Sequence, residues 1–186
     1  MQNEINDCVK VLKTGGVILF PTDTIWGLGC DATDQNAVNK VFDLKKRDKQ
    51  KPLVILLYDE NRLFDYVKDV PDVAFDLIEL SDAPLTIIYS NAKNLAAEVI
   101  ADDGSVAIRI CKSDACSEVL KRFRKPIVAT SANFSNKKAP ADFNDISPDL
   151  IEKVDFVYNS EYYNTNKKPS QIIKINNDST FKIIRS

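Results

Sequence analysis

Basic, hydroxyl and amide side chains gather at a few points of this sequence where they could bind an anion together. A basic run, KKRDKQK, begins at Lys45 and carries five positive charges against one negative charge. Arg47 offers a planar fork of donors that fits phosphate or carboxylate oxygens, while Lys45 and Lys51 add point charges. Ser131 and Asn133 supply a hydroxyl and an amide, which suit a phosphate oxygen, a ribose or a carbamoyl group. These side chains predict a site for a small anionic ligand.

The chain contains no histidine among its 186 residues. Ser–His–Asp and Cys–His nucleophile systems are therefore excluded. Any chemistry must rest on lysine, arginine, carboxylates, hydroxyls and backbone amides. The sequence also has no Walker lysine loop and no G-x-G-x-x-G motif, so a nucleotide would have to be held by side chains.

Three polar clusters lie just after, or at the end of, short apolar runs that predict buried strands. Ligands of open α/β sheets bind outside the carboxyl ends of the strands, so these clusters would meet in one concave basic cleft if the strands are parallel there. Taken singly, the P-T-D-T segment can be a turn and S-A-N a helix cap, and the K-K-R of the basic run can be a solvated helix end. A helical basic run would put Lys45 and Lys49 on one face and Arg47 on another, so which cations converge stays open. The clusters are Thr22–Thr24, Arg109 and Ser131–Asn133.

Strand and helix patterns alternate along the chain and must position these clusters. Apolar residues at helical spacing predict helices over 5–12, 72–80 and 114–123, and a fourth that is capped by Asp34 and ends in the basic run. The segment 21–31 is typical of a loop. The alternation predicts the α/β class: a single domain over residues 1–186, with a twisted open mixed sheet and flanking helices. Strands are predicted at 17–20, 53–58, 85–89, 106–110, 127–130, 156–158, 170–175 and 181–184.

The spacing of the cysteines and the hydropathy of the chain predict whether the protein binds a metal and in which cellular compartment it lies. No cysteine pair has C-x-x-C spacing, so buried reduced thiols are favoured over zinc ligands and we expect no structural metal held by the protein. The start of the chain lacks the features of a secretory signal, and no apolar run is long enough to span a bilayer, which predicts a cytoplasmic protein without a membrane partner. The net charge of −2 gives no overall basic character. The four cysteines are Cys8, Cys30, Cys111 and Cys116.

Eight short motifs recur in an order and approximate spacing that characterise one family. They are Gly15–Ala32, Leu44–Arg47, Lys51–Leu53, Pro84–Thr86, Val106–Arg109, Thr130–Ser135, Pro169-Ser170 and Ile183–Arg185. On these motifs the sequence resembles the YrdC family of threonylcarbamoyl-AMP synthases over essentially its whole length. Because it stops just after I-I-R, it resembles the short bacterial form with a single YrdC-like domain.

The resemblance implies an enzyme that combines L-threonine, bicarbonate and ATP into threonylcarbamoyl adenylate and releases pyrophosphate. It implies Mg²⁺ carried by the ATP phosphates, a downstream threonylcarbamoyl transferase machinery that modifies tRNA, and tRNA or double-stranded RNA as a candidate partner. The family's K-x-R and S-x-N signature, implied to be catalytic, falls on Lys45, Arg47, Ser131 and Asn133. The family pattern lines the threonine pocket with Thr24, Arg109, Ser131 and Ser170. It lines the ATP site with Arg47, Lys51, Ser105, Asn133 and Arg185.

A few positions depart from the family pattern. Ala83 stands where Trp-Pro-Gly usually precedes Pro-Leu-Thr, Asn136 replaces a glycine after S-A-N-x-S, and Gln171 replaces a threonine after the pocket serine. Asn136 can still reach the left-handed conformation. None of the three removes an expected contact, although Ala83 and Gln171 can alter the shape of the pocket.

Two other functions fit parts of the pattern. Basic pairs such as Lys121-Arg122 and Arg124-Lys125 would suit an RNA-binding module with an inert cleft, but no aromatic stacking motif accompanies them. A related carbamoyl-adenylating domain that uses carbamoyl phosphate is the other alternative. Domains of that kind lie within longer, cysteine-rich chains, which this chain does not resemble.

Overall fold

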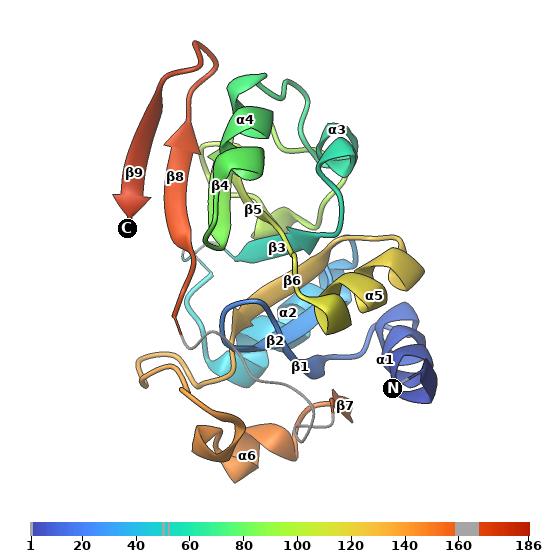
Figure 1. Cartoon of the computed structure of the whole chain (residues 1–186). Coiled ribbons are helices and arrows are strands. Elements are labelled where there is room, and N and C mark those ends of the chain that lie inside the picture. Colours follow the sequence, from blue (N-terminus) through green and yellow to red (C-terminus); the bar gives the residue numbers. More distant parts are fainter. Residues whose placement is uncertain (1, 50, 52, 159–167) are drawn as a thin grey trace.

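A mixed sheet runs through the part of the chain that the structure describes, and helices cover both of its faces (Figure 1). The computed structural model describes residues 2–49, 51, 53–158 and 168–186. Within these residues the strand order is β7-β1-β2-β6-β3-β5-β4-β8-β9. Three neighbouring pairs are parallel, β1 with β7, β3 with β5 and β4 with β8, and the others are antiparallel, so the predicted mixed α/β sheet is confirmed. The strands are β1 (Ile18–Pro21), β2 (Trp26–Asp31), β3 (Val54–Leu57), β4 (Leu85–Tyr89), β5 (Val106–Ile110), β6 (Ile127–Ser131), β7 (Phe156–Val157), β8 (Gln171–Ile175) and β9 (Phe181–Arg185).

The four predicted helices are all present, and Asp34 caps the second as expected. Its side chain accepts hydrogen bonds from the backbone N–H groups of Asn36, at 2.9 Å, and Ala37, at 3.2 Å. None of the described helices is both long and apolar enough to cross a bilayer. The helices are α1 (Gln2–Lys13), α2 (Gln35–Lys45), α3 (Leu63–Tyr66), α4 (Val73–Leu80), α5 (Asp114–Phe123) and α6 (Pro148–Ile151), with short 3₁₀ turns at η1 (Glu60–Arg62), η2 (Ala97–Val99) and η3 (Phe143–Asp145).

The segment predicted as a loop over 21–31 contains a strand, which corrects the sequence prediction. Residues Trp26–Asp31 form β2, which pairs with β1 on one side and β6 on the other, and all six of its residues are buried. Its two glycines weaken strand propensity, which hid the strand. Packing explains Gly29, because a Cβ there would lie 2.6 Å from the Phe20 ring and 2.9 Å from Ile127.

The strands that carry the polar clusters do not all run the same way, which corrects the assumption of parallel strand ends. Strands β1 and β6 are both antiparallel to β2, so Thr22, just after β1, and Ser131, the last residue of β6, lie at the same end of the sheet. Strand β5 is parallel to β3, which is antiparallel to β6, so β5 runs the opposite way. Arg109 therefore lies near Thr22 and Ser131 because of its position within β5, and not because the strands are parallel.

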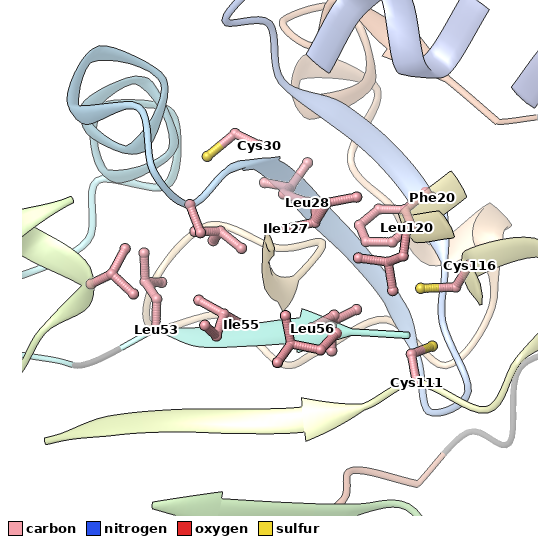
Figure 2. Close-up of a cluster of buried hydrophobic side chains, with 14 of the residues drawn as sticks. Phe20, Leu28, Cys30, Leu53, Ile55, Leu56, Cys111, Cys116, Leu120 and Ile127 are labelled. Carbon is pink, nitrogen blue, oxygen red and sulfur yellow. The ribbon is translucent and has the colours of Figure 1, made fainter. Parts of the chain in front are cut away.

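A continuous apolar core fixes the central strands. Figure 2 shows buried side chains that converge from β1, β2, β3, β6 and α5, among them Phe20, Leu56, Leu120 and Ile127. Helices α1 and α5 pack against each other and against β1, while α2 packs against β2. Because side chains alternate along a strand, Gly29, Phe20 and Ile127 share one face. The same face, beyond the area covered by α5, is open and forms the pocket.

Candidate active site

A pocket of about 340 Å³ opens on this face of the sheet, which is within the usual size for a small-molecule site. Its floor consists of small side chains on neighbouring strands, Gly27 and Ala129, together with Val54. Three arginines line it, and no acidic residue is among the described residues of its walls. The remaining lining residues are Thr22, Thr24, Ile25, Arg47, Leu53, Arg109, Thr130, Ser131, Ala139, Pro169, Ser170 and Arg185.

Arg109 enters the pocket from β5 and is held by a carboxylate. Its Nη2 lies 3.1 Å from Oδ1 of Asp23, and both side chains are largely buried, 7% and 11% exposed. Asp23 belongs to the loop between β1 and β2, so this loop extends to β5 across the intervening strands. The Arg109 Nε is buried without a hydrogen-bond partner among the described residues. An unsatisfied buried donor in a pocket wall is suited to an anionic ligand.

Arg185 is directed to the same face by an irregularity at the edge of the sheet. Ile183 pairs with Ile173, but Arg185 pairs with Ile172, so one extra residue lies in β9 between these pairs. A bulge of this kind turns the next side chain to the opposite face. Arg185 consequently joins the cross-strand row that contains Thr86 and Arg109. Without the bulge, its side chain would point to the same face as Ile183.

The end of α2 explains why Arg47 and Lys45 have different environments. Lys46 adopts a left-handed conformation, with φ 50° and ψ 45°, and closes the helix by donating its N–H to the Asp43 carbonyl. The chain turns at this residue, so Lys45 points into the protein while Arg47 lines the pocket. The Nε of Arg47 donates to the Lys51 carbonyl at 3.2 Å.

Two of the three arginines, Arg109 and Arg185, lie close enough for their charges to repel each other. Burial lowers the pKa of the Arg185 guanidinium, and the nearby charge of Arg109 lowers it further. Burial likewise lowers the pKa of Arg47. Arg47 and Arg185 remain cations at neutral pH because the ordinary pKa of arginine lies so far above it. A bound carboxylate or phosphate would offset this repulsion, which makes the pocket an anion site.

Hydroxyl groups form two hydrogen-bonded sets around the arginines. Thr22 Oγ1 lies 2.9 Å from Thr24 Oγ1 and donates to the Ile25 carbonyl at 2.8 Å. On the other side, Thr86 Oγ1 lies 2.7 Å from Ser170 Oγ, and both residues are buried. Nε and Nη2 of Arg185 donate to the Ser170 carbonyl at 3.0 and 2.8 Å. These contacts fix where the hydroxyls point, which a site needs in order to select one substrate.

Lys45 does not line the pocket, although it touches the segment that does. Its side chain is 1% exposed, and its Nζ donates to the carbonyls of Ser131 and Asn133. The Ser131 hydroxyl in turn donates to Asn133 Oδ1 at 2.5 Å. The four signature residues that lie far apart in the sequence are therefore brought together, with Arg47 and Ser131 in the pocket wall.

Three residues predicted for the ATP site lie outside the residues that line this pocket. Lys51 is exposed, Ser105 is buried just before β5, and the Asn133 amide donates to the Lys137 carbonyl at 2.5 Å. Their role toward ATP stays a prediction. Pro52, in the K-P-L motif, lies outside the described residues.

The cysteines are buried and reduced. Burial raises the pKa of Cys8 to about 12 and raises that of Cys116 well above its ordinary value. Figure 2 shows the sulfurs of Cys111 and Cys116 next to each other in the core. No group of three or more His, Cys, Asp or Glu side chains that could hold a metal ion occurs in the described ranges.

Several residues of the site were not predicted from the sequence. Asp23 lies within the predicted Thr22–Thr24 cluster but had no role assigned to it, and Thr86 belongs to the P-L-T motif, where a search for polar residues would have found it. Gly27 forms part of the floor because it lacks a side chain, and only a structure identifies such a role. Arg185 was predicted from its motif, but the bulge that turns its side chain toward the pocket leaves no signal in the sequence.

Comparisons with known proteins match this arrangement. The sequence model of the Sua5/YciO/YrdC family, described as "Telomere recombination", matches residues 10–186. The threonylcarbamoyl-AMP synthase of Psychromonas ingrahamii is 35% identical over 74% of this chain and 74% of its own length, and that of Pseudoalteromonas translucida is 28% identical over 97% and 98%. The structure of Pyrococcus abyssi Sua5 complexed with L-threonine superposes with a TM-score of 0.87 at 25% identity, over 94% of this chain and 52% of that longer chain. The chain belongs to the Sua5/YciO/YrdC family.

Proposed function

We propose that this chain, as one domain over residues 1–186, is a threonylcarbamoyl-AMP synthase. It joins L-threonine, bicarbonate and ATP into L-threonylcarbamoyladenylate and releases pyrophosphate. The observation that carries the proposal is a pocket with three convergent arginines and oriented hydroxyls, in a chain similar over most of its length to relatives of that name. A sheet fold alone would not argue for a reaction, but the site on it does.

Threonine fits the part of the pocket around Arg109. The guanidinium of Arg109 binds the carboxylate, with its free Nε as one donor. Thr24, Ser131 and Ser170 provide hydroxyls that recognise the β-hydroxyl and the amino group of threonine. Asp23 keeps Arg109 in place and offsets part of its charge.

ATP binds Arg47 and Arg185, which line the same pocket. These two residues, with Lys51, Ser105 and Asn133, hold the nucleotide and its phosphates. Magnesium bound to ATP would be held mainly by the phosphates and water, and it would supply positive charge near the leaving pyrophosphate. The side chains that this protein contributes are cations and hydrogen-bond donors, which suits phosphoryl chemistry governed by position and charge.

The reaction requires no histidine. Threonine's amino group and bicarbonate condense to a carbamate with loss of water. A carbamate oxygen then attacks the α-phosphorus, a P–O bond forms, and the bond to the β-phosphate breaks with departure of pyrophosphate. Because the carbamate is already an anion, no general base is needed at this step, and the arginines stabilise the charge that develops on the phosphate.

The product supplies the threonylcarbamoyl group for threonylcarbamoyladenosine in tRNA. We propose that a downstream transferase receives it and that the reaction takes place in the cytoplasm. Direct RNA binding by the basic pairs near α5 is less supported, because Lys121 pairs with Glu118 at 3.1 Å and Lys125 with Asp31 at 2.7 Å.

Pyrophosphate release from ATP, with one component omitted at a time, tests the proposal. We expect release to require both threonine and bicarbonate, and labelled bicarbonate to enter an adenylate. Pyrophosphate release that does not depend on threonine contradicts the proposal. Release that depends on carbamoyl phosphate assigns the chain to the related carbamoyl-adenylating reaction, and RNA affinity at moderate salt without any release assigns it to RNA binding.

A further inference from the structure

Lys45 is a lysine whose amine is withdrawn from both solvent and pocket. It is the last residue of α2 and is 1% exposed. Its Nζ donates to the Ser131 carbonyl, to the Asn133 carbonyl at 2.6 Å and to Asn133 Oδ1 at 3.4 Å. Buried lysines are rare unless their charge is compensated, so this arrangement calls for an explanation.

The set of acceptors matches a charged amine. An ammonium has three N–H donors and no acceptor, and three oxygens surround this one. Burial lowers the pKa of Lys45 to about 7, and Arg47 acts in the same direction. The three oxygens oppose this effect because each favours the protonated form. With its donors used in this way, the amine has none left for a phosphate.

The segment that Lys45 holds carries pocket groups. Ser131 lines the pocket and its hydroxyl donates to Asn133 Oδ1 at 2.5 Å. The same helix end contributes a further bond, because the N–H of Ser135 donates to the Lys45 carbonyl at 2.9 Å. Lys45 therefore holds residues 131–135 through two groups, its side-chain amine and its backbone carbonyl.

We propose that Lys45 is a positioning residue that acts through residues 131–133 and does not touch the substrates. It holds the Ser131 hydroxyl and the Asn133 amide in the geometry that the proposed reaction uses. The signature's lysine thus differs from its arginine, since Arg47 reaches the pocket directly. The inference rests on the proposed function for its ATP-analogue and kinetic tests, whereas its hydrogen-exchange test is independent of that function.

The first experiment uses the wild-type protein and so is independent of any variant's folding. The ¹⁵Nζ signal of Lys45 is recorded with and without α,β-methylene ATP, whose binding is followed calorimetrically in the same sample. We expect a slowly exchanging signal that keeps its chemical shift when the analogue binds. A large shift of that signal, or a coupling to ³¹P, would show contact with phosphate and overturn the inference.

The second experiment measures hydrogen exchange at the amides of residues 132–135. Lys45→Met keeps the length of the side chain and removes its donors. We expect the exchange of these amides to speed up by about tenfold or more while α1 is unchanged, because opening of a local segment costs less when its anchor is lost. Lys49→Met, an exposed lysine four residues along the chain, is the control and should change nothing there. Unaltered exchange in Lys45→Met contradicts the inference.

Kinetics then separate a positioning role from a direct one. The KM for threonine should rise in Lys45→Met, and the effects of Lys45→Met and Ser131→Ala should be strongly non-additive, because both disturb one hydrogen-bonded unit. If the fold-changes of the two single variants simply multiply in the double variant, the inference is contradicted. If the wild type releases no pyrophosphate, the proposed function fails, whereas the hydrogen-exchange experiment still decides whether Lys45 holds residues 131–133.

Discussion

The central strands and the β8–β9 hairpin build the two sides of the pocket in different ways. Strand β2 is buried at every residue, whereas all five residues of β9 are exposed. Each side contributes one arginine, Arg109 from within the sheet and Arg185 from its edge. Each side also has an ion pair: Asp23 with Arg109 at 3.1 Å, and Asp103 with Lys174 at 2.8 Å.

The shorter of these two ion pairs is the weaker contributor. The Asp103 and Lys174 side chains are 55% and 35% exposed, so water and salt screen their attraction. The Asp23–Arg109 pair is shielded from water, and loss of one partner leaves the other charge buried. Burial, more than distance, decides the consequence of breaking each pair.

Arg109→Met should have the largest effect. We expect kcat/KM to fall by about a thousandfold, since the ligand loses a buried charged partner. The free energy of unfolding should fall by about 3 kcal/mol because Asp23 is left buried without its partner. Kinetics and urea unfolding measure the two effects. Adding Asp23→Asn should restore most of the stability without restoring activity; restored activity would show that Arg109 does not bind substrate.

Gly27→Val should fill the pocket floor. A Cβ at Gly27 would lie 3.3 Å from the Thr130 carbonyl oxygen, and the added methyl groups would project into the pocket. We expect kcat/KM to fall by about 100-fold, with a stability loss of about 1–2 kcal/mol from overpacking. Ala107→Val, also on a central strand but outside the pocket lining, is the control and should remain active. Full activity in Gly27→Val would mean that the floor does not contact substrate.

Arg185→Ala should have a smaller effect, because the hairpin adds to an already formed site. We expect a fall in kcat/KM of about tenfold from the loss of one charged contact. The midpoint of thermal unfolding should hardly change, since β9 is exposed. Lys182→Ala, on the same strand, is the matched control and should behave as the wild type. Equal effects of the two substitutions would refute the role of the bulge.

Asp103→Asn should have the smallest effect. Hydrogen bonds from Lys174 and then from Ser105 lower the pKa of Asp103 to about 2. Because the folded-state pKa is depressed, the stabilisation is present at neutral pH and is lost as the pH falls from about 4 through about 2. We expect a cost of about 0.5 kcal/mol at pH 7, smaller in high salt. Urea unfolding at several pH values measures it, and a cost that persists at the acid end would contradict this origin.

The sequence predicted the elements better than their directions. Apolar periodicity found all four main helices, and the Asp34 cap was correct because capping depends on local chemistry. Strand β2 was missed because glycines are poor strand formers, and its need for Gly29 arises from contacts with Phe20 and Ile127. Strand direction depends on the pairing of distant segments, which periodicity does not encode.

The site was predicted as residue types, and the structure adds their geometry. Motifs pointed to Arg47, Arg109 and Ser131, which do line one pocket. The different environments of Lys45 and Arg47 follow from the left-handed conformation of Lys46, and the placement of Arg185 follows from a one-residue register shift. Both are backbone features, so side-chain chemistry alone could not predict them.

Calorimetric titration with L-threonine tests most directly whether the arginine-lined pocket is the substrate site. The folded Asp23→Asn/Arg109→Met variant is compared with the wild type and with Lys182→Ala. We predict saturable binding to the wild type and to Lys182→Ala, and no detectable binding to the double variant. Threonine that binds the double variant as tightly as the wild type would contradict the assignment of this pocket.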